Sequence, residues 1–152
     1  MRMKKILFVC HGNICRSPMA EFILRDMITQ QGIRDIEVSS AATSTEEIGN
    51  GVYPPVRRLL AGLGIDTSGK TARQIRPADY AAFDLIIGMD HANIRNMHRV
   101  FGGDPEDKIR LLLSFAGCAR EVADPWYSGE FDVCLSDIRT GCEALLAELL
   151  SK

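Results

Sequence analysis

The stretch ILFVCHGNICRSPMAEFIL, residues 6–24, decides how the fold is read. It begins within a short apolar run, residues 5–10, which is typical of a strand buried on both faces. After a polar turn, Ser17 suits the N-cap of a helix and Pro18 suits its first helical position. Glu21 then falls in the expected first turn, where a negative charge is favourable. The segment is therefore predicted to fold as strand, turn and helix.

Further apolar runs predict three more strands, at residues 36–40, 85–89 and 109–113. Helical patterns lie between and after them, at residues 54–63, 77–82, 92–100 and 131–150. Strands that alternate with helices indicate a parallel sheet with helices on both faces. Because the chain has 152 residues and no repeat or linker, we expect a single α/β domain over residues 1–152.

Charge and apolar content narrow the classes of partner. The 18 basic and 20 acidic residues give a formal net charge of −2, which argues against binding of nucleic acid or of an acidic membrane surface. The N-terminal apolar run ends at Cys10 and is shorter than the roughly 7–15 residues of a signal-peptide core or the about 20 of a membrane span. We therefore expect a cytoplasmic protein without a membrane or nucleic-acid partner, most simply a monomer.

The cysteines show no disulfide framework. There are five, an odd number, and no CxxC pair or histidine cluster indicates a metal site. Free thiols in a reducing compartment are the simpler interpretation. We expect neither a metal nor an organic cofactor.

The turn after the first predicted strand combines features that suit an anion. A helix N-terminus presents unpaired N–H groups, and Gly12 and Asn13 tolerate the unusual backbone angles of a concave nest. Arg16 adds a planar fork for two phosphate oxygens. The same positive field favours the thiolate form of Cys10, which makes this residue a candidate nucleophile facing phosphorus. The nucleotide motifs GxGxxG and GxxxxGK[ST] do not occur.

The sequence VCHGNICRSPMAE, residues 9–21, resembles the signature of the low-molecular-weight protein tyrosine phosphatases. Further segments resemble the family in its order along the chain: SAAT at 40–43, ARQI at 72–75, GMD at 88–90 and DPWY at 124–127. The similarity covers essentially the whole chain. It implies a doubly wound, flavodoxin-like parallel sheet of four strands in the order 2-1-3-4.

The resemblance also implies a metal-free, two-step hydrolysis of phosphotyrosine in proteins. Cys10 would attack phosphorus to form a phosphocysteine, Arg16 would hold the phosphoryl oxygens, and Asp124 would act as general acid and then general base. Phosphate-binding positions would be His11, Gly12, Asn13, Ile14, Cys15 and Arg16. Supporting positions would be Ser17, Ser40 and Asp90, and an aromatic wall would be formed by Trp126 and Tyr127.

Several positions depart from the family pattern. His11 stands where relatives usually carry an apolar or small residue, and we expect it to face solvent. Lys70 replaces a histidine that supports the phosphate loop in many relatives. Glu46 and Glu47 stand where some relatives place an aromatic side chain at the pocket rim.

Three other functions remain open on the same sequence. Arsenate reductases of this type use a downstream cysteine pair, which Cys118, Cys134 and Cys142 do not resemble. Protein-arginine phosphatases tend to carry threonine at the position of Ile14, whose apolar edge would leave guanidinium N–H groups unpaired. A phosphate-binding module without turnover is disfavoured by the presence of both Cys10 and Asp124.

Cys15 is predicted to be a redox partner of Cys10. Oxidation of Cys10 to a sulfenic acid would allow Cys15 to capture it as a disulfide. Because the turn must fold back to enclose phosphate, we expect the two Cα atoms to lie within the bridging limit of about 7 Å.

Overall fold

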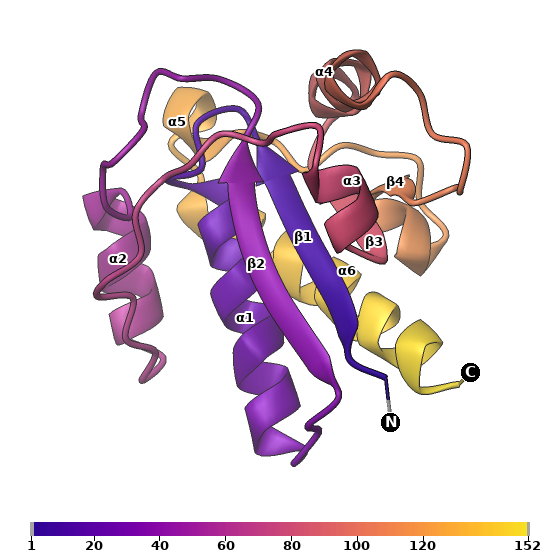
Figure 1. Cartoon of the computed structure of the whole chain (residues 1–152). Coiled ribbons are helices and arrows are strands. Elements are labelled where there is room, and N and C mark those ends of the chain that lie inside the picture. Colours follow the sequence, from indigo (N-terminus) through magenta and orange to yellow (C-terminus); the bar gives the residue numbers. More distant parts are fainter. Residues whose placement is uncertain (1, 152) are drawn as a thin grey trace.

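In the computed structural model, which describes residues 2–151, the strands form one parallel sheet in the order β2-β1-β3-β4 (Figure 1). The strands are β1 (Lys4–Cys10), β2 (Ile36–Ala42), β3 (Leu85–Gly88) and β4 (Ile109–Leu111). The order and the parallel direction confirm the predicted doubly wound α/β fold.

Helices cover both faces of this sheet. They are α1 (Arg16–Gln30), α2 (Pro54–Ala61), α3 (Asp79–Ala82), α4 (His91–Phe101), α5 (Pro125–Ser128) and α6 (Phe131–Leu150), with a 3₁₀ helix, η1, at Leu112–Ala116. Helices α1 and α6 pack together on one face, and α3 and α4 lie on the other (Figure 1). Within residues 2–151, no helix combines the length and the apolar character that crossing a membrane requires.

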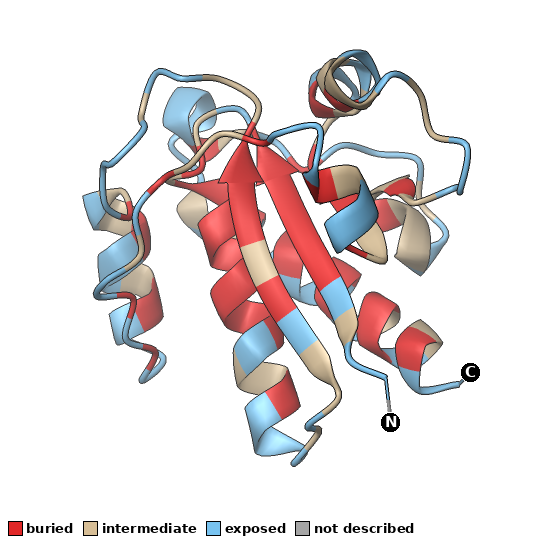
Figure 2. Ribbon diagram, viewed as in Figure 1, coloured by how far each residue is buried: buried red, intermediate tan, exposed pale blue. Residues whose placement is uncertain are grey.

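The apolar run of β1 is explained by its central position. Ile6 and Phe8 point into the core formed with α1 and α6, whereas Leu7 and Val9 point into the core formed with α3 and α4. All four side chains are fully buried, as the red centre of the sheet in Figure 2 shows. Strand side chains alternate between faces, so a strand covered on both sides must be apolar at every position.

The sheet order brings the loops after β1 and β3 together at the carboxyl edge. The chain leaves β1 for β2 on one side and later returns to β3 on the other, which creates a switch point between β1 and β3. Gly88 ends β3 with no room for a side chain, because an added Cβ would lie 2.9 Å from Met97 Cε and 3.1 Å from Asn93 Cβ. This close approach holds α4, and Asp90 at its N-terminus, beside the end of β1.

The predicted start of α1 is wrong. The helix begins at Arg16, and Cys15 occupies the N-cap position without a side-chain capping bond. The Ser17 hydroxyl therefore does not cap the helix but contacts Cys10 and Asn13. For the same reason Glu21 lies beyond the first turn, and it is buried.

Other element boundaries differ at their ends. The fourth strand stops at Leu111 because the chain tightens into η1. The expected helix at 77–82 is a single turn, Asp79–Ala82, and the helix from Pro54 ends at Ala61. A short helix, α5, occupies the DPWY segment, where no helix was predicted, while α6 has the expected bounds.

Candidate active site

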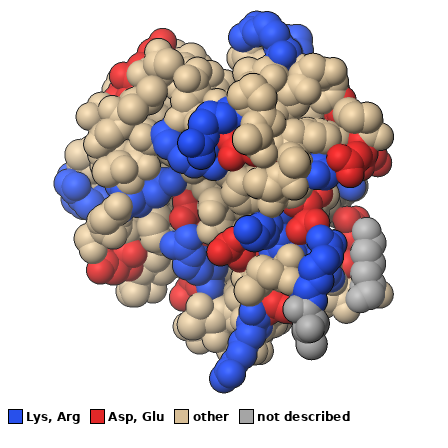
Figure 3. All heavy atoms as spheres, viewed as in Figure 1, with Lys and Arg blue, Asp and Glu red and all other residues tan. Residues whose placement is uncertain are grey.

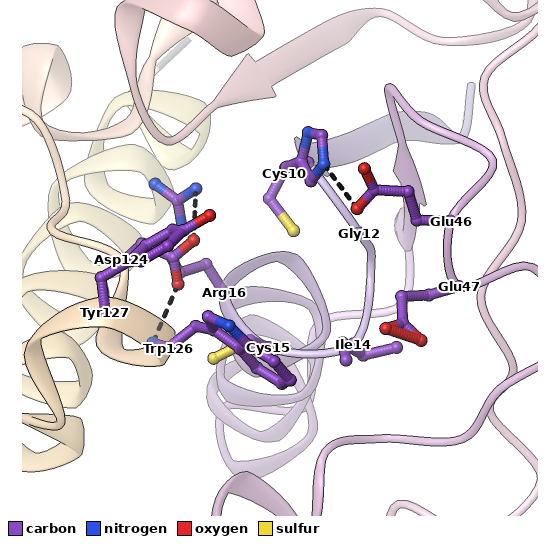
Figure 4. Close-up of a pocket in the computed structure, with 11 residues that line it drawn as sticks. Cys10, Gly12, Ile14, Cys15, Arg16, Glu46, Glu47, Asp124, Trp126 and Tyr127 are labelled. Atoms are coloured by element: carbon purple, nitrogen blue, oxygen red, sulfur yellow. Dashed lines mark hydrogen bonds and ion pairs between the residues drawn. The ribbon is translucent and has the colours of Figure 1, made fainter.

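A pocket opens at the carboxyl edge of the sheet, above the end of β1 (Figure 4). Its lining comes from the turn between β1 and α1, from the loop after β2 and from the start of α5. The lining residues are Cys10, His11, Gly12, Ile14, Cys15, Arg16, Glu46, Glu47, Asp124, Trp126 and Tyr127.

The turn at residues 11–15 has the form of an anion cradle. In the described part of the chain, the N–H groups of Gly12, Ile14 and Cys15 donate to no other protein atom, and all three residues line the pocket. Asn13 adopts the left-handed conformation, with φ of 60°. Gly12 does not, although an added Cβ there would make a tight contact, 3.3 Å from Glu47 Cγ. Free amides around one concave turn can hold a tetrahedral oxyanion.

The Cys10 sulfur lies at the floor of this cradle and is surrounded by donors. The backbone N–H groups of Asn13 and Ser17 point to Sγ over 3.3 and 3.4 Å. Ser17 Oγ lies 2.9 Å from the same sulfur and 3.5 Å from the Ala41 carbonyl oxygen. Hydrogen bonds donated to sulfur stabilise its negatively charged form.

A chain of hydrogen bonds orients the Ser17 hydroxyl. Asn13 Nδ2 donates to Ser17 Oγ and to Ser40 Oγ, each over 2.9 Å, and Ser40 Oγ donates to Glu21 Oε1 over 2.5 Å. A carboxylate only accepts hydrogen bonds, so it fixes the direction of the Ser40 hydroxyl. Ser17 Oγ accepts from Asn13, and its own proton can be directed to the Cys10 sulfur or to the Ala41 carbonyl.

Glu21 is the buried end of this chain, and two cations balance its charge. Arg25 donates to its Oε2, and Lys70 Nζ lies 3.3 Å from its Oε1. Lys70 also donates to the Ser40 carbonyl over 3.0 Å. Burial lowers the pKa of Lys70 and Glu21 offsets part of that effect, so the pKa remains below its ordinary value. Lys70 thus supports the phosphate loop through Glu21 and Ser40.

Sequence reasoning did not identify Glu21 as part of this support. The signal that could have found it is an acidic residue inside an otherwise apolar stretch, since Ala20 and Phe22 on either side are buried. A carboxylate rarely lies in such a place without a paired cation.

The Arg16 guanidinium is buried and held from several sides. Nη1 donates to Asp90 Oδ2 over 2.8 Å and to the Val122 carbonyl over 2.9 Å, and Nη2 lies 3.5 Å from Asp124 Oδ2. Burial by itself lowers the pKa of Arg16, but the negative charges of Cys10, Asp124 and Asp90 raise it above its ordinary value. The guanidinium is therefore a fixed positive charge beside the cradle.

Asp124 begins α5 and faces the pocket. Its Oδ1 accepts the N–H of Trp126 over 3.1 Å, which caps the short helix. The Trp126 ring lies 4.7 Å from the Tyr53 ring, centre to centre, and Tyr127 is largely exposed. Both aromatic side chains line the pocket, with Tyr53 bracing Trp126; the sequence had not indicated Tyr53.

The remaining candidate residues lie around these groups. His11 is exposed and lies close to Glu46, with 2.9 Å between Nε2 and Oε2. Burial raises the pKa of the Cys15 thiol well above its usual range, and it raises the pKa of Cys134 to about 12. All five cysteines are free thiols, and within residues 2–151 no group of three or more His, Cys, Asp or Glu side chains could hold a metal ion.

Comparison with known proteins places this site in a family. The family model described as low molecular weight phosphotyrosine protein phosphatase matches residues 5–152. The Bacillus subtilis low molecular weight protein-tyrosine-phosphatase YfkJ is 39% identical over 150 residues, which cover 97% of this chain and 96% of the relative. The rat phosphatase of the same description is 38% identical over 152 residues, with 94% of each chain covered.

Solved structures agree with the sequence comparison. The crystal structure of Bacillus subtilis YfkJ matches with a TM-score of 0.95 and 38% identity, covering 99% of this chain and 97% of that one. A crystal structure of a Drosophila arginine phosphatase matches with a TM-score of 0.86 and 32% identity, covering 95% of this chain and 97% of that one. The chain belongs to the low-molecular-weight protein tyrosine phosphatase family.

Proposed function

We propose that this enzyme hydrolyses phosphotyrosine in proteins through a phosphocysteine at Cys10. The observation that carries the proposal is the Cys10 sulfur at the floor of a cradle of free amides, with the fixed Arg16 guanidinium beside it. An arrangement of this kind places a nucleophile against the phosphorus of a bound phosphoryl group and balances the charge on its oxygens.

The proposed reaction has two chemical steps. The Cys10 thiolate attacks phosphorus, the bond to the phenolic oxygen breaks, and protonated Asp124 gives its proton to the leaving oxygen. Asp124, now a carboxylate, then takes a proton from water as the water attacks the phosphocysteine. Phosphate leaves and the thiolate is restored. General acid help of this kind contributes about 10²–10⁴-fold.

The first test is a Cys10→Ser variant assayed on an aryl phosphate and a phosphotyrosine peptide with EDTA present. We expect turnover to be abolished while vanadate or phosphate binding survives in part, because the cradle amides remain. Undiminished turnover in the variant would exclude Cys10 as the nucleophile. Binding without turnover by the parent enzyme would instead indicate a phosphate-binding module.

Hydrolysis of phosphoarginine is the second candidate activity, and one observation favours it. Glu46 and Glu47 line the pocket together with Ile14, so its edge is not only apolar and could accept hydrogen bonds from a guanidinium. We favour phosphotyrosine because Ile14 and Tyr127 line the pocket where a phenyl ring would pack. The test compares kcat/KM on matched phosphotyrosine and phosphoarginine peptides. Ile14→Thr should reduce the preference for phosphotyrosine. Equal values for the two peptides in the parent enzyme would overturn the assignment to phosphotyrosine.

Cys15 is proposed as the redox partner of Cys10. Peroxide would oxidise the Cys10 thiolate to a sulfenic acid; attack by Cys15 sulfur would form the disulfide and release water. Cys15 lines the same pocket as Cys10. Since burial raises the pKa of Cys15, its thiolate is scarce at neutral pH, and disulfide formation should accelerate as pH rises. Dithiothreitol should restore the oxidised parent; equal recovery of a Cys15→Ser variant would contradict the role.

The other cysteines give little support to arsenate reduction. Cys134 and Cys142 are buried on α6, and burial raises the pKa of both thiols, which suits packing better than electron transfer. The direct test is thiol-dependent arsenate reduction, which we expect to be absent.

Five free thiols also support the proposal that the enzyme works in the reducing cytoplasm.

A further inference from the structure

The pocket has two sides of opposite character. Trp126 and Tyr127 stand on one side beside Asp124, and Glu46 and Glu47 stand on the other, across the cradle (Figure 4). On the face shown in Figure 3, basic and acidic side chains are interspersed. The acidic side, Glu46 and Glu47, is called the acidic rim below.

Neighbouring side chains hold the acidic rim in place. Glu46 Oε2 lies 2.9 Å from His11 Nε2, and Glu47 Oε2 accepts the side-chain N–H of Asn50 over 2.6 Å. The Glu47 stem lies against Gly12, where even one added carbon would come within 3.3 Å. Both carboxylates therefore have a hydrogen-bond partner that favours their position at the pocket wall.

Two carboxylates beside a phosphate cradle disfavour a substrate that carries only negative charge. A phosphoryl group brings about two negative charges at neutral pH. The cradle and Arg16 neutralise that charge at the floor, but Glu46 and Glu47 repel any further negative charge that enters with the substrate. A positive charge on the substrate near the phosphorylated residue would reverse the sign of this interaction.

We propose that the acidic rim selects phosphotyrosines flanked by lysine or arginine. This inference rests on the proposed phosphotyrosine activity and names the class of peptide that serves it. With the phenyl ring against Tyr127 and Ile14, the residues adjacent to phosphotyrosine pass the mouth of the pocket, where Glu46 and Glu47 lie. A lysine or arginine there pairs with the rim, and a glutamate there is repelled.

The size of the preference follows from the exposure of the rim. The Glu46 side chain is 67% exposed, so water and salt screen its interactions. Exposed ion pairs are each worth up to about fivefold in an equilibrium, and we expect the two glutamates together to give a preference of about tenfold.

The experiment measures kcat/KM on matched phosphotyrosine peptides that carry either lysine or glutamate at both flanking positions. At low ionic strength the lysine peptide should be preferred about tenfold, and the preference should shrink in 0.5 M NaCl. In a Glu46→Gln/Glu47→Gln variant it should fall to about twofold or less, chiefly because the glutamate peptide improves. Glu143→Gln, an exposed change on α6, is the matched control and should keep the parental preference.

The outcomes separate this inference from the proposed function. Rapid turnover of both peptides at equal rates would overturn the rim as a specificity determinant and leave the phosphotyrosine activity intact. A preference that persists unchanged in the double variant would also overturn it. Absence of turnover on every phosphotyrosine peptide, with turnover of phosphoarginine, would overturn the proposed function itself.

Discussion

The Arg16 guanidinium lies 3.5 Å from the Asp124 carboxylate, measured from Nη2 to Oδ2, although 108 residues separate them along the chain. The other terminal nitrogen of Arg16 holds Asp90 and the Val122 carbonyl. One buried side chain therefore connects the phosphate loop with the loop after β3 and with the segment that carries the proposed general acid. Removing it disturbs both phosphate binding and the placement of Asp124.

Arg16→Lys should lower kcat/KM on aryl phosphates by more than tenfold, a loss above about 1.4 kcal/mol of transition-state stabilisation. An ammonium cannot contact two phosphoryl oxygens and two protein acceptors with the fork geometry of a guanidinium. A melting curve should accompany the kinetics, because Asp90 loses a partner. A folded variant with more than a tenth of parental activity would show that Arg16 acts only structurally.

Asp124→Asn should slow hydrolysis most for substrates with poor leaving groups. The amide cannot donate a proton, and phenolates of high basicity need one in order to leave. The measurement is kcat across a series of aryl phosphates of differing leaving-group pKa, in the parent and the variant. An equal loss across the series would mean that Asp124 only positions other groups, such as Arg16 or Trp126.

Glu21→Gln should weaken stabilisation of the Cys10 thiolate from a distance. The neutral amide holds the Ser40 hydroxyl less strongly, and the chain through Asn13 to Ser17 loses its fixed direction. We expect alkylation of Cys10 by iodoacetate at pH 5.5 to slow severalfold. Asp26→Asn on the same helix serves as the control and should leave the rate unchanged.

A second variant separates this effect from simple loss of stability. Glu21→Gln alone strands the partly buried Lys70, whereas Glu21→Gln combined with Lys70→Met removes both charges. The double variant should recover melting temperature but not the alkylation rate. Recovery of both would make Glu21 a structural residue without a role in positioning the donor to Cys10.

Gly141→Ala should destabilise the fold by about 1–3 kcal/mol, although alanine favours helix over glycine by about 1 kcal/mol. An added Cβ would lie 2.4 Å from Leu112 Cγ, so α6 and η1 could not keep their spacing. Chemical denaturation measures the loss, and Thr140→Ala, an exposed change on α6, is the control for helix propensity. In the background Leu112→Ala the added penalty should shrink; an unchanged penalty would exclude the clash as its cause.

Local pattern was sufficient for much of the fold. The apolar run of β1, the alternation of strands and helices and the bounds of α6 follow from burial and periodicity, which are readable along the chain. The cradle segment was also located from local pattern, because a strand followed by a polar turn and a helix N-terminus is typical of an anion site; phosphate binding there stays a prediction. The start of α1 was misplaced because Ser-Pro is a good local start signal, whereas the Ser17 hydroxyl has closer partners in Cys10 and Asn13.

Tertiary structure alone decided which distant residues complete the site. Arg16 meets Asp90 because the sheet order places the loops after β1 and β3 at one edge. Asp124 reaches the same edge on the segment after η1, where the Val122 N–H donates to the Met89 carbonyl. Glu21 meets Lys70 because the buried face of α1 packs near the segment that follows α2. Such pairings depend on how segments far apart in the chain fold onto each other, so local periodicity does not predict them. A charged residue in an apolar stretch indicates that it needs a partner, but only the fold determines which residue that partner is.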